Sequence, residues 1–160
     1  MANDADFQFL MDAPLGKDLS AEECSVLASK MTKRQLRDGD YLVKSGDKIR
    51  TLFILESGSL TVNASEVGHE TVLYTMGIGE CAGTRSFVEG TPRKASLRAA
   101  GDTTVHALEP DAFESLLATH PMIVYKVMRG MFRQTHANLV KMDVNFQQLS
   151  NYISKTGGRY

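Results

Sequence analysis

Short apolar runs separated by glycine-containing turns occupy the chain from Lys33 to Glu109. The runs recur about every 8 to 12 residues and each has the length of a strand, which is typical of a closed roll or sandwich and not of alternating strands and helices. We therefore predict seven or eight strands in this part of the chain. The clearest of them are expected at Tyr41–Val43, Thr51–Leu55, Ser59–Val62, Thr71–Met76, Ala95–Ala100 and Thr103–Leu108.

Helical patterns flank the strands on both sides. Ser20 with Glu23 three residues later forms a capping box, which predicts a helix over residues 21–31. After the strands, residues 111–119 have the spacing of a short helix, and Pro121 opens a longer one. The long helix is expected to end near Met142, with a separate final helix before residue 157.

The predicted fold class is therefore mainly β, a jelly-roll-like β-roll of about eight strands flanked by N-terminal and C-terminal α-helices. We expect a single domain over residues 1–160, because a chain of this length suits one compact core. Its parts are an N-terminal helical segment over 1–32, the roll over 33–110 and the C-terminal helices over 111–160.

An apolar stripe runs along the long C-terminal helix at steps of three and four residues. Its members are Val124, Met128, Met131, Leu139 and Met142. The spacing fits burial against the roll and equally fits contact with a partner, so a homodimer through this helix is one of two open interpretations. Methionine suits either role, since its flexible side chain fills cores and also adapts to interfaces.

Composition excludes several classes of function. The formal net charge of -1 leaves no general basic surface for nucleic acid, and the two cysteines and four histidines lack metal-ligand spacing. No paired-carboxylate, Ser-His-Asp or Cys-His arrangement is recognisable, so we do not expect an enzyme or a cofactor. The acidic N-terminus lacks the pattern of a secretory signal and no apolar stretch is long enough for a membrane span, which indicates a cytoplasmic protein.

The segment over residues 79–97 carries the most chemistry, because it combines a glycine turn, a helical turn and an arginine. Gly83 lets the backbone N–H groups of the following turn approach an anion, since it has no side chain. Arg93 follows Pro92 at the entry of the next strand, where its guanidinium can close over the same anion. The alternative for Arg93 is a surface ion pair with Glu89 or Glu80.

This segment, ending in Gly90-Thr91-Pro92-Arg93, resembles the phosphate-binding cassette of the cyclic-nucleotide-binding domain family. That family includes the catabolite activator proteins and the protein kinase A regulatory subunits. The resemblance covers residues 15–140 and implies an eight-stranded β-roll, a short helix in the cassette and a C-terminal helix that covers the bound base. Further matches lie at Leu19–Glu23, Asp38–Asp40, Ser45–Asp47, Phe53–Val62 and Ala112–Leu117.

The resemblance implies a ligand such as cAMP or cGMP and assigns the ligand-binding residues. They are Gly83, Thr84, Arg85, Ser86, Arg93, Lys94 and Ala95. Arg93 would pair with the cyclic phosphate, and the amides of Gly83 and Ala95 would support it.

Three residues of the cassette depart from the family pattern. Thr84 stands where the family usually has a glutamate that accepts a hydrogen bond from the ribose 2′-hydroxyl, which would weaken binding by about 10- to 100-fold. Thr84 is equally suited to cap the cassette helix. Ala82 replaces a bulky apolar residue and Lys94 a small or hydroxylated one.

Two functions follow from these observations. The first is a stand-alone cyclic-nucleotide sensor that acts in trans on a partner protein through its C-terminal helices. The second is a degenerate member of the same fold that serves as a protein-interaction or dimerisation module. Direct DNA binding is not expected, because residues 143–160 contain only Lys155 and Arg159 as basic residues and lack room for a helix-turn-helix.

Four residues of the long helix are candidates for covering a bound base, with none preferred. They are Arg129, Phe132, Arg133 and His136.

Overall fold

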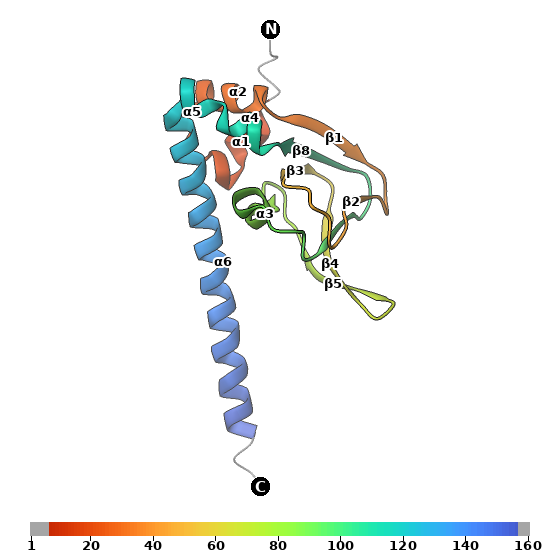
Figure 1. The fold of residues 1–160 in the computed structure, drawn as a ribbon. Coiled ribbons are helices and arrows are strands. Elements are labelled where there is room, and N and C mark those ends of the chain that lie inside the picture. The colour runs from red at the N-terminus through yellow and green to blue at the C-terminus, as the bar shows by residue number, and fades with distance from the viewer. Residues whose placement is uncertain (1–6, 157–160) are drawn as a thin grey trace.

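The computed structural model describes residues 7–156, which form eight strands in two antiparallel sheets with helices beside them (Figure 1). The strands are β1 (Thr32–Leu36), β2 (Tyr41–Val43), β3 (Leu52–Ser57), β4 (Leu60–Glu66), β5 (His69–Thr75), β6 (Cys81–Ala82), β7 (Ser96–Ala99) and β8 (Thr103–Leu108). One sheet has the order β1-β8-β3-β6 and the other β2-β7-β4-β5. The prediction of a β-roll flanked by helices is confirmed.

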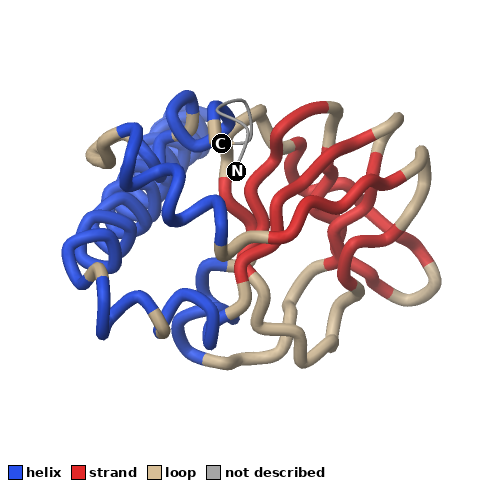
Figure 2. Tube along the Cα trace, turned by 90° about the horizontal axis from the view of Figure 1, so that it is seen from above, coloured by secondary structure: helices blue, strands red, loops and turns tan. Residues whose placement is uncertain are grey.

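The helices lie on one side of the roll, as the view from above shows (Figure 2). They are α1 (Gln8–Asp12), the short 3-10 helix η1 (Pro14–Gly16), α2 (Ala21–Ser29), α3 (Thr84–Glu89), α4 (Pro110–Glu114), α5 (Leu116–Thr119) and α6 (Pro121–Thr156). The capping box of α2 is formed as expected: Ser20 Oγ accepts from the Glu23 amide at 3.1 Å, and the Ser20 amide donates to Glu23 Oε1 at 3.0 Å.

The apolar pattern of the strands predicts most of their positions but not β1 or β6. The residues of β1 include Lys33, Arg34 and Gln35, and the strand pairs with β8 although its side chains are mostly exposed. With only two residues, β6 is too short to show a pattern, yet it pairs with β3. The pairing with β8 therefore holds β1 although its side chains are mostly exposed, whereas β6 pairs with β3 and also buries Ala82 in the core.

Two clusters of buried side chains hold the fold together. One fills the interior of the roll, where Phe53, Leu55 and Val105 have almost no exposed surface. The other joins the helices to the outer face of the β3-β8 sheet and includes Leu27 and Ile54. Each such fully buried side chain stabilises the fold by roughly 1.5–3 kcal/mol.

Helix α6 is one continuous helix of 36 residues, so the break expected near Met142 is wrong. No proline interrupts it, and Gly130 is buried where α6 crosses η1, with an added Cβ only 3.2 Å from the Leu15 carbonyl oxygen. At about 1.5 Å per residue the helix is roughly 54 Å long. Figure 1 shows that its C-terminal half extends well past the roll.

The face that α6 buries differs from the predicted stripe. The buried apolar side chains are Ile123, Val127 and Met131, of which only Met131 belongs to the predicted stripe. Met128 is 39% and Leu139 58% exposed. The predicted stripe had combined members of two neighbouring faces, because steps of three and four can be drawn along either side of a helix. Val124 is partly buried, and the side chain of Met142 lies outside the described residues.

Candidate nucleotide-binding site

The cassette helix α3 lies between two glycines in the left-handed backbone conformation. Gly83 precedes it with φ of 87° and Gly90 follows it with φ of 75°, values that other residues rarely adopt. Gly83, which has no side chain, is the N-cap, and Thr84 is the first helical residue, so no side chain caps this helix. The proposed capping role of Thr84 is therefore wrong, and its side chain instead lines the cavity described below.

Arg93 is buried beside this helix, with only 6% of its surface exposed. Its Nε donates a hydrogen bond to the Ile49 carbonyl at 2.9 Å and Nη2 donates to the Thr51 carbonyl. The guanidinium also lies over the ring of Phe53, 5.6 Å from its centroid. These contacts orient the group so that Nη1 lies against Gly83.

The positive charge of Arg93 has no close counter-ion in the described part of the chain. None of the ion pairs there includes Arg93, and its side-chain acceptors are backbone carbonyls. Burial lowers the pKa of the guanidinium, an effect opposed by the more distant charges of Asp47 and Glu109. Because a buried charge is costly without compensation, this position favours an anion beside it.

A cavity of about 330 Å³ lies between the cassette, the roll and α6. All of the residues expected at the ligand site line it, namely Gly83, Thr84, Arg85, Ser86, Arg93, Lys94 and Ala95. Val43, Val62, Met76 and Leu97 add an apolar wall. The cavity thus combines a cationic end with an apolar side, and its size falls within the range of about 300–1,000 Å³ that is usual for small-molecule sites.

The alternative ion pairs considered for Arg93 are not formed. Glu89 pairs instead with Arg85 at 3.3 Å along α3, and both side chains are largely exposed. Glu80 accepts hydrogen bonds from Tyr74. Arg93 is therefore part of the cavity wall and is not paired with a surface carboxylate.

Five polar residues that the sequence did not assign to the ligand also line the cavity. They are Tyr74, Glu80, Thr91, Gln134 and Asn138. The hydroxyl oxygen of Thr91 is buried and has no hydrogen-bond partner in the described part of the protein, so a ligand or water is needed to satisfy it. Gln134 and Asn138 are one helical turn apart, so they lie on the same face of α6. The sequence does not show that this face is turned toward the roll.

The four candidates on α6 for covering a base do not line this cavity. Arg133 and Arg129 lie 2.9 and 3.9 Å from Asp18, and Phe132 is 73% exposed. His136 stacks on Phe132. Their positions follow from the burial of Ile123, Val127 and Met131, which sets the rotation of the helix.

No group of three or more metal-ligating side chains occurs within residues 7–156, and Cys24 and Cys81 are both free thiols. Burial raises the pKa of Cys81 to about 12, so this thiol stays protonated at neutral pH. Over the same residues, no helix is both long enough and apolar enough to cross a membrane.

The fold and the site together define a β-roll protein with a small-molecule cavity built around a buried arginine. The profile of the cyclic nucleotide-binding domain matches residues 33–120, more than half of the chain, so the protein belongs to the cyclic nucleotide-binding domain family.

The similar proteins include cAMP-dependent protein kinase regulatory subunits and a cyclic AMP receptor protein. The chain is 30% identical over 96 residues to a cAMP-dependent protein kinase regulatory subunit of Mycosarcoma maydis, covering 60% of this chain and 18% of that protein. It is 24% identical over 144 residues to the cyclic AMP receptor protein of Thermus thermophilus, covering 89% and 67%. The chain therefore spans only about a fifth of the kinase regulatory subunit.

A solved structure gives the same fold. A cyclic nucleotide-binding domain from Methylobacillus flagellatus superposes with a TM-score of 0.79 at 26% sequence identity, covering 86% of this chain and 80% of that one.

Proposed function

We propose that the protein is a regulatory module that binds a cyclic nucleotide such as cAMP or cGMP in the cavity beside α3. The observation that carries this proposal is the buried guanidinium of Arg93, which pairs with no carboxylate among residues 7–156 and lies against Gly83 in the cavity wall. A cyclic phosphate supplies the missing negative charge, and its oxygens suit the fork of an arginine.

The other lining residues fit the remaining parts of such a ligand. Arg85 and Lys94 add positive charge near the phosphate, and Thr84 offers a hydroxyl to the ribose. The apolar side chains of Val62 and Leu97 suit the flat face of a purine. Family membership supports the same assignment.

The proposed response runs through α6. Gln134 and Asn138 line the cavity, so a bound nucleotide contacts the same helix whose C-terminal half projects past the roll (Figure 1). A ligand that binds one position of α6 better than another shifts the population toward that position and alters contact with a partner in trans. No chemical step is required of the protein, which acts as a non-enzymatic regulator.

Calorimetric titration with cAMP and with cGMP tests this function directly. Saturable one-to-one binding of either nucleotide, accompanied by a rise in melting temperature, is the expected result. If neither nucleotide binds nor shifts the melting temperature, the cavity has lost its ligand and the degenerate interaction module is the better description.

Replacing Thr84 by glutamate is expected to tighten cAMP binding about tenfold, because a carboxylate accepts a charge-assisted hydrogen bond from the ribose 2′-hydroxyl. The new acid also lies in the first turn of α3, where negative charge is favourable. Calorimetry with 2′-deoxy-cAMP is the matched control, since the gain should vanish without the hydroxyl. Equal gains for both ligands would contradict the assigned contact.

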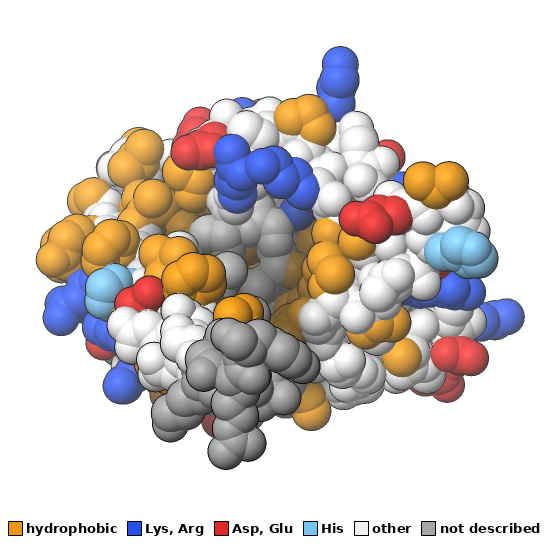
Figure 3. Space-filling view, turned by 90° about the horizontal axis from the view of Figure 1, so that it is seen from below, with side chains coloured by type: hydrophobic (Ala, Val, Ile, Leu, Met, Phe, Trp, Pro, Cys, Tyr) orange, Lys and Arg blue, Asp and Glu red, His pale blue; other side chains and the backbone are white. Residues whose placement is uncertain are grey.

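A homodimer through α6 is the second element of the proposal, and it rests on the exposed face of this helix. Exposed apolar side chains recur there every seventh residue. Met128, three residues after the first of them, lies on the same side of the helix. The recurring residues are Tyr125, Phe132, Leu139, Phe146 and Ile153. Figure 3 shows hydrophobic side chains gathered on the helical flank of the molecule.

A second copy of the chain is the occupant that best fits this face. A two-stranded coiled coil needs apolar residues at two positions of a seven-residue repeat. The recurring residues supply one of these positions and Met128 adds to the other, and an identical helix carries the same repeat in register. The recurring residues carry no charge, and a projecting helix without tertiary packing is only marginally stable in water. The face also continues into a hollow beside α3 that is lined by Val88, Met128 and Phe132.

Replacing Leu139 by glutamate is expected to convert the dimer to a monomer, since two carboxylates would face each other in the seam. Sedimentation equilibrium measures this as a fall from twice 17.6 kDa to 17.6 kDa. Asn151→Glu is the control, because Asn151 is exposed on the same helix away from the repeat. A wild-type chain that sediments as a monomer at micromolar concentration would refute the dimer.

A further inference from the structure

One carboxylate stands among the described residues that line the candidate nucleotide cavity, and it belongs to Glu80. The other charged groups there are Arg85, Arg93 and Lys94. Glu80 takes part in none of the ion pairs between described residues. A half-buried carboxylate in a cationic cavity, without an ionic partner, is an acceptor available to a ligand.

Tyr74 holds this carboxylate in place. The tyrosine hydroxyl lies 2.6 Å from Glu80 Oε1 and 2.9 Å from Oε2, so it donates across both oxygens. This hydrogen bond is the main cause of the raised pKa of Tyr74, which therefore remains a donor at neutral pH. A carboxylate has about four lone-pair positions, so each oxygen of Glu80 can accept a further hydrogen bond.

Glu80 lies at the end of the cavity formed by α6. Glu80, Gln134 and Asn138 also line a neighbouring hollow of about 560 Å³ between α6 and the N-terminal segment. Arg93 and Lys94 do not reach that hollow. Glu80, Gln134 and Asn138 thus line both hollows, which places them toward α6 and away from the cassette end, where Arg93 lies and the phosphate is expected.

We propose that Glu80 reads the base of the bound nucleotide and favours guanine over adenine. This inference rests on the proposed cyclic nucleotide function. The pairing edge of guanine presents two adjacent N–H donors, which match the two oxygens of a carboxylate, beside a carbonyl oxygen that an amide of Gln134 or Asn138 can meet. Adenine presents one amino donor next to a ring nitrogen acceptor, which a carboxylate repels.

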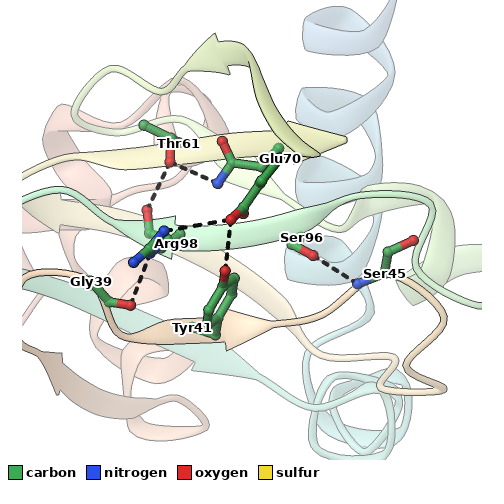
Figure 4. A network of polar contacts seen from close by, with 8 residues as sticks. Gly39, Tyr41, Ser45, Thr61, Glu70, Ser96 and Arg98 are labelled. Carbon is green, nitrogen blue, oxygen red and sulfur yellow. Dashed lines mark hydrogen bonds and ion pairs between the residues drawn. The ribbon is translucent and has the colours of Figure 1, made fainter. Parts of the chain in front are cut away.

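A similar pair outside the cavity provides a matched control. Glu70 accepts a hydrogen bond of 2.7 Å from the hydroxyl of Tyr41 and lies 3.5 Å from Arg98. Figure 4 shows Tyr41 and Arg98 both directed at Glu70. Neither Glu70 nor Tyr41 lines the candidate site. Removing the charge of Glu70 therefore tests the general effect of losing a tyrosine-bound carboxylate.

The experiment is calorimetric titration of the wild-type chain, Glu80→Gln and Glu70→Gln with cGMP, cIMP, cAMP and 2′-deoxy-cGMP. We expect the wild type to bind cGMP about tenfold more tightly than cAMP, with cIMP between them because it lacks the amino donor. Glu80→Gln should remove this preference by weakening cGMP, while cAMP affinity stays equal or rises because the repulsion of the adenine ring nitrogen is lost. Glu70→Gln should match the wild type, and Tyr74→Phe should lose part of the preference.

The outcomes separate the inference from the function on which it rests. If the wild type binds none of these nucleotides, the proposed function fails. If it binds them but Glu80→Gln keeps the wild-type ratio of cGMP to cAMP affinity, Glu80 does not read the base. If Glu80→Gln weakens all ribonucleotides equally but leaves 2′-deoxy-cGMP unchanged, the carboxylate contacts the ribose and the base assignment is overturned.

Discussion

Replacing Arg93 by alanine is expected to weaken cyclic nucleotide binding by about 100-fold or more, the effect of removing one partner of a desolvated charge pair. Arg93 is 6% exposed, and the carbonyls of Ile49 and Thr51 hold its guanidinium in the cavity wall. Calorimetry with the preferred nucleotide measures the loss. Unchanged affinity in a folded variant would remove Arg93 from the site.

Two further variants separate this binding loss from a loss of structure. Arg98→Ala removes an arginine that likewise donates to a backbone carbonyl, that of Gly39, but lies outside the cavity, so binding should stay unchanged. Arg93→Lys keeps the positive charge but loses the two-pronged guanidinium. We expect its affinity to lie between those of the wild type and Arg93→Ala. Thermal unfolding of Arg93→Ala should show a loss of about 1–3 kcal/mol, since two carbonyls lose their donor.

Replacing Gly83 by alanine is expected to produce the second-largest effect, because the new Cβ would overlap the Arg93 guanidinium. The positive φ of 87° adds backbone strain of about 1–3 kcal/mol. Displacing a guanidinium that two carbonyls hold should reduce nucleotide affinity on the order of 100-fold, comparable to truncating it. Calorimetry and thermal unfolding on the same sample report both effects.

Gly101→Ala controls for the strain alone. Gly101 also has a positive φ, of 85°, but an added Cβ there meets nothing within 4 Å. This variant should therefore lose stability and keep its affinity. A Gly83→Ala protein that behaves in the same way would show that Arg93 tolerates the extra carbon and that the close approach is not needed for binding.

The local sequence predicted a glycine turn, a helical turn and an arginine, and the resemblance to the cyclic-nucleotide-binding domain family assigned this segment as the cassette. Gly83 and Gly90 bracket a short helix because only glycine tolerates their backbone angles, and Arg93 follows at the entry of β7. The ends of β2 and β8 agree with their apolar runs, and the capping box of α2 formed at Ser20. These features depend on contacts between residues close in the chain, so spacing alone predicts them.

The far side of the cavity was not predictable in this way. Gln134 and Asn138 reach it only because Ile123, Val127 and Met131 turn their face of α6 toward the N-terminal helices. A 3.6-residue period is compatible with several rotations of a helix, and packing against distant segments selects one. The same rotation exposes Phe132 and Leu139 and so creates the candidate dimer face.

Glu80 illustrates the difference most clearly. The sequence analysis considered it one of two candidate ion-pair partners for Arg93, because the two residues are close in the chain. Tyr74, six residues before Glu80 in the chain, donates to the carboxylate, while Arg93 donates to the carbonyls of Ile49 and Thr51, which are 44 and 42 residues away. Backbone angles and turn positions follow from neighbouring residues, whereas the partner of a charged side chain depends on which distant strands and helices enclose it.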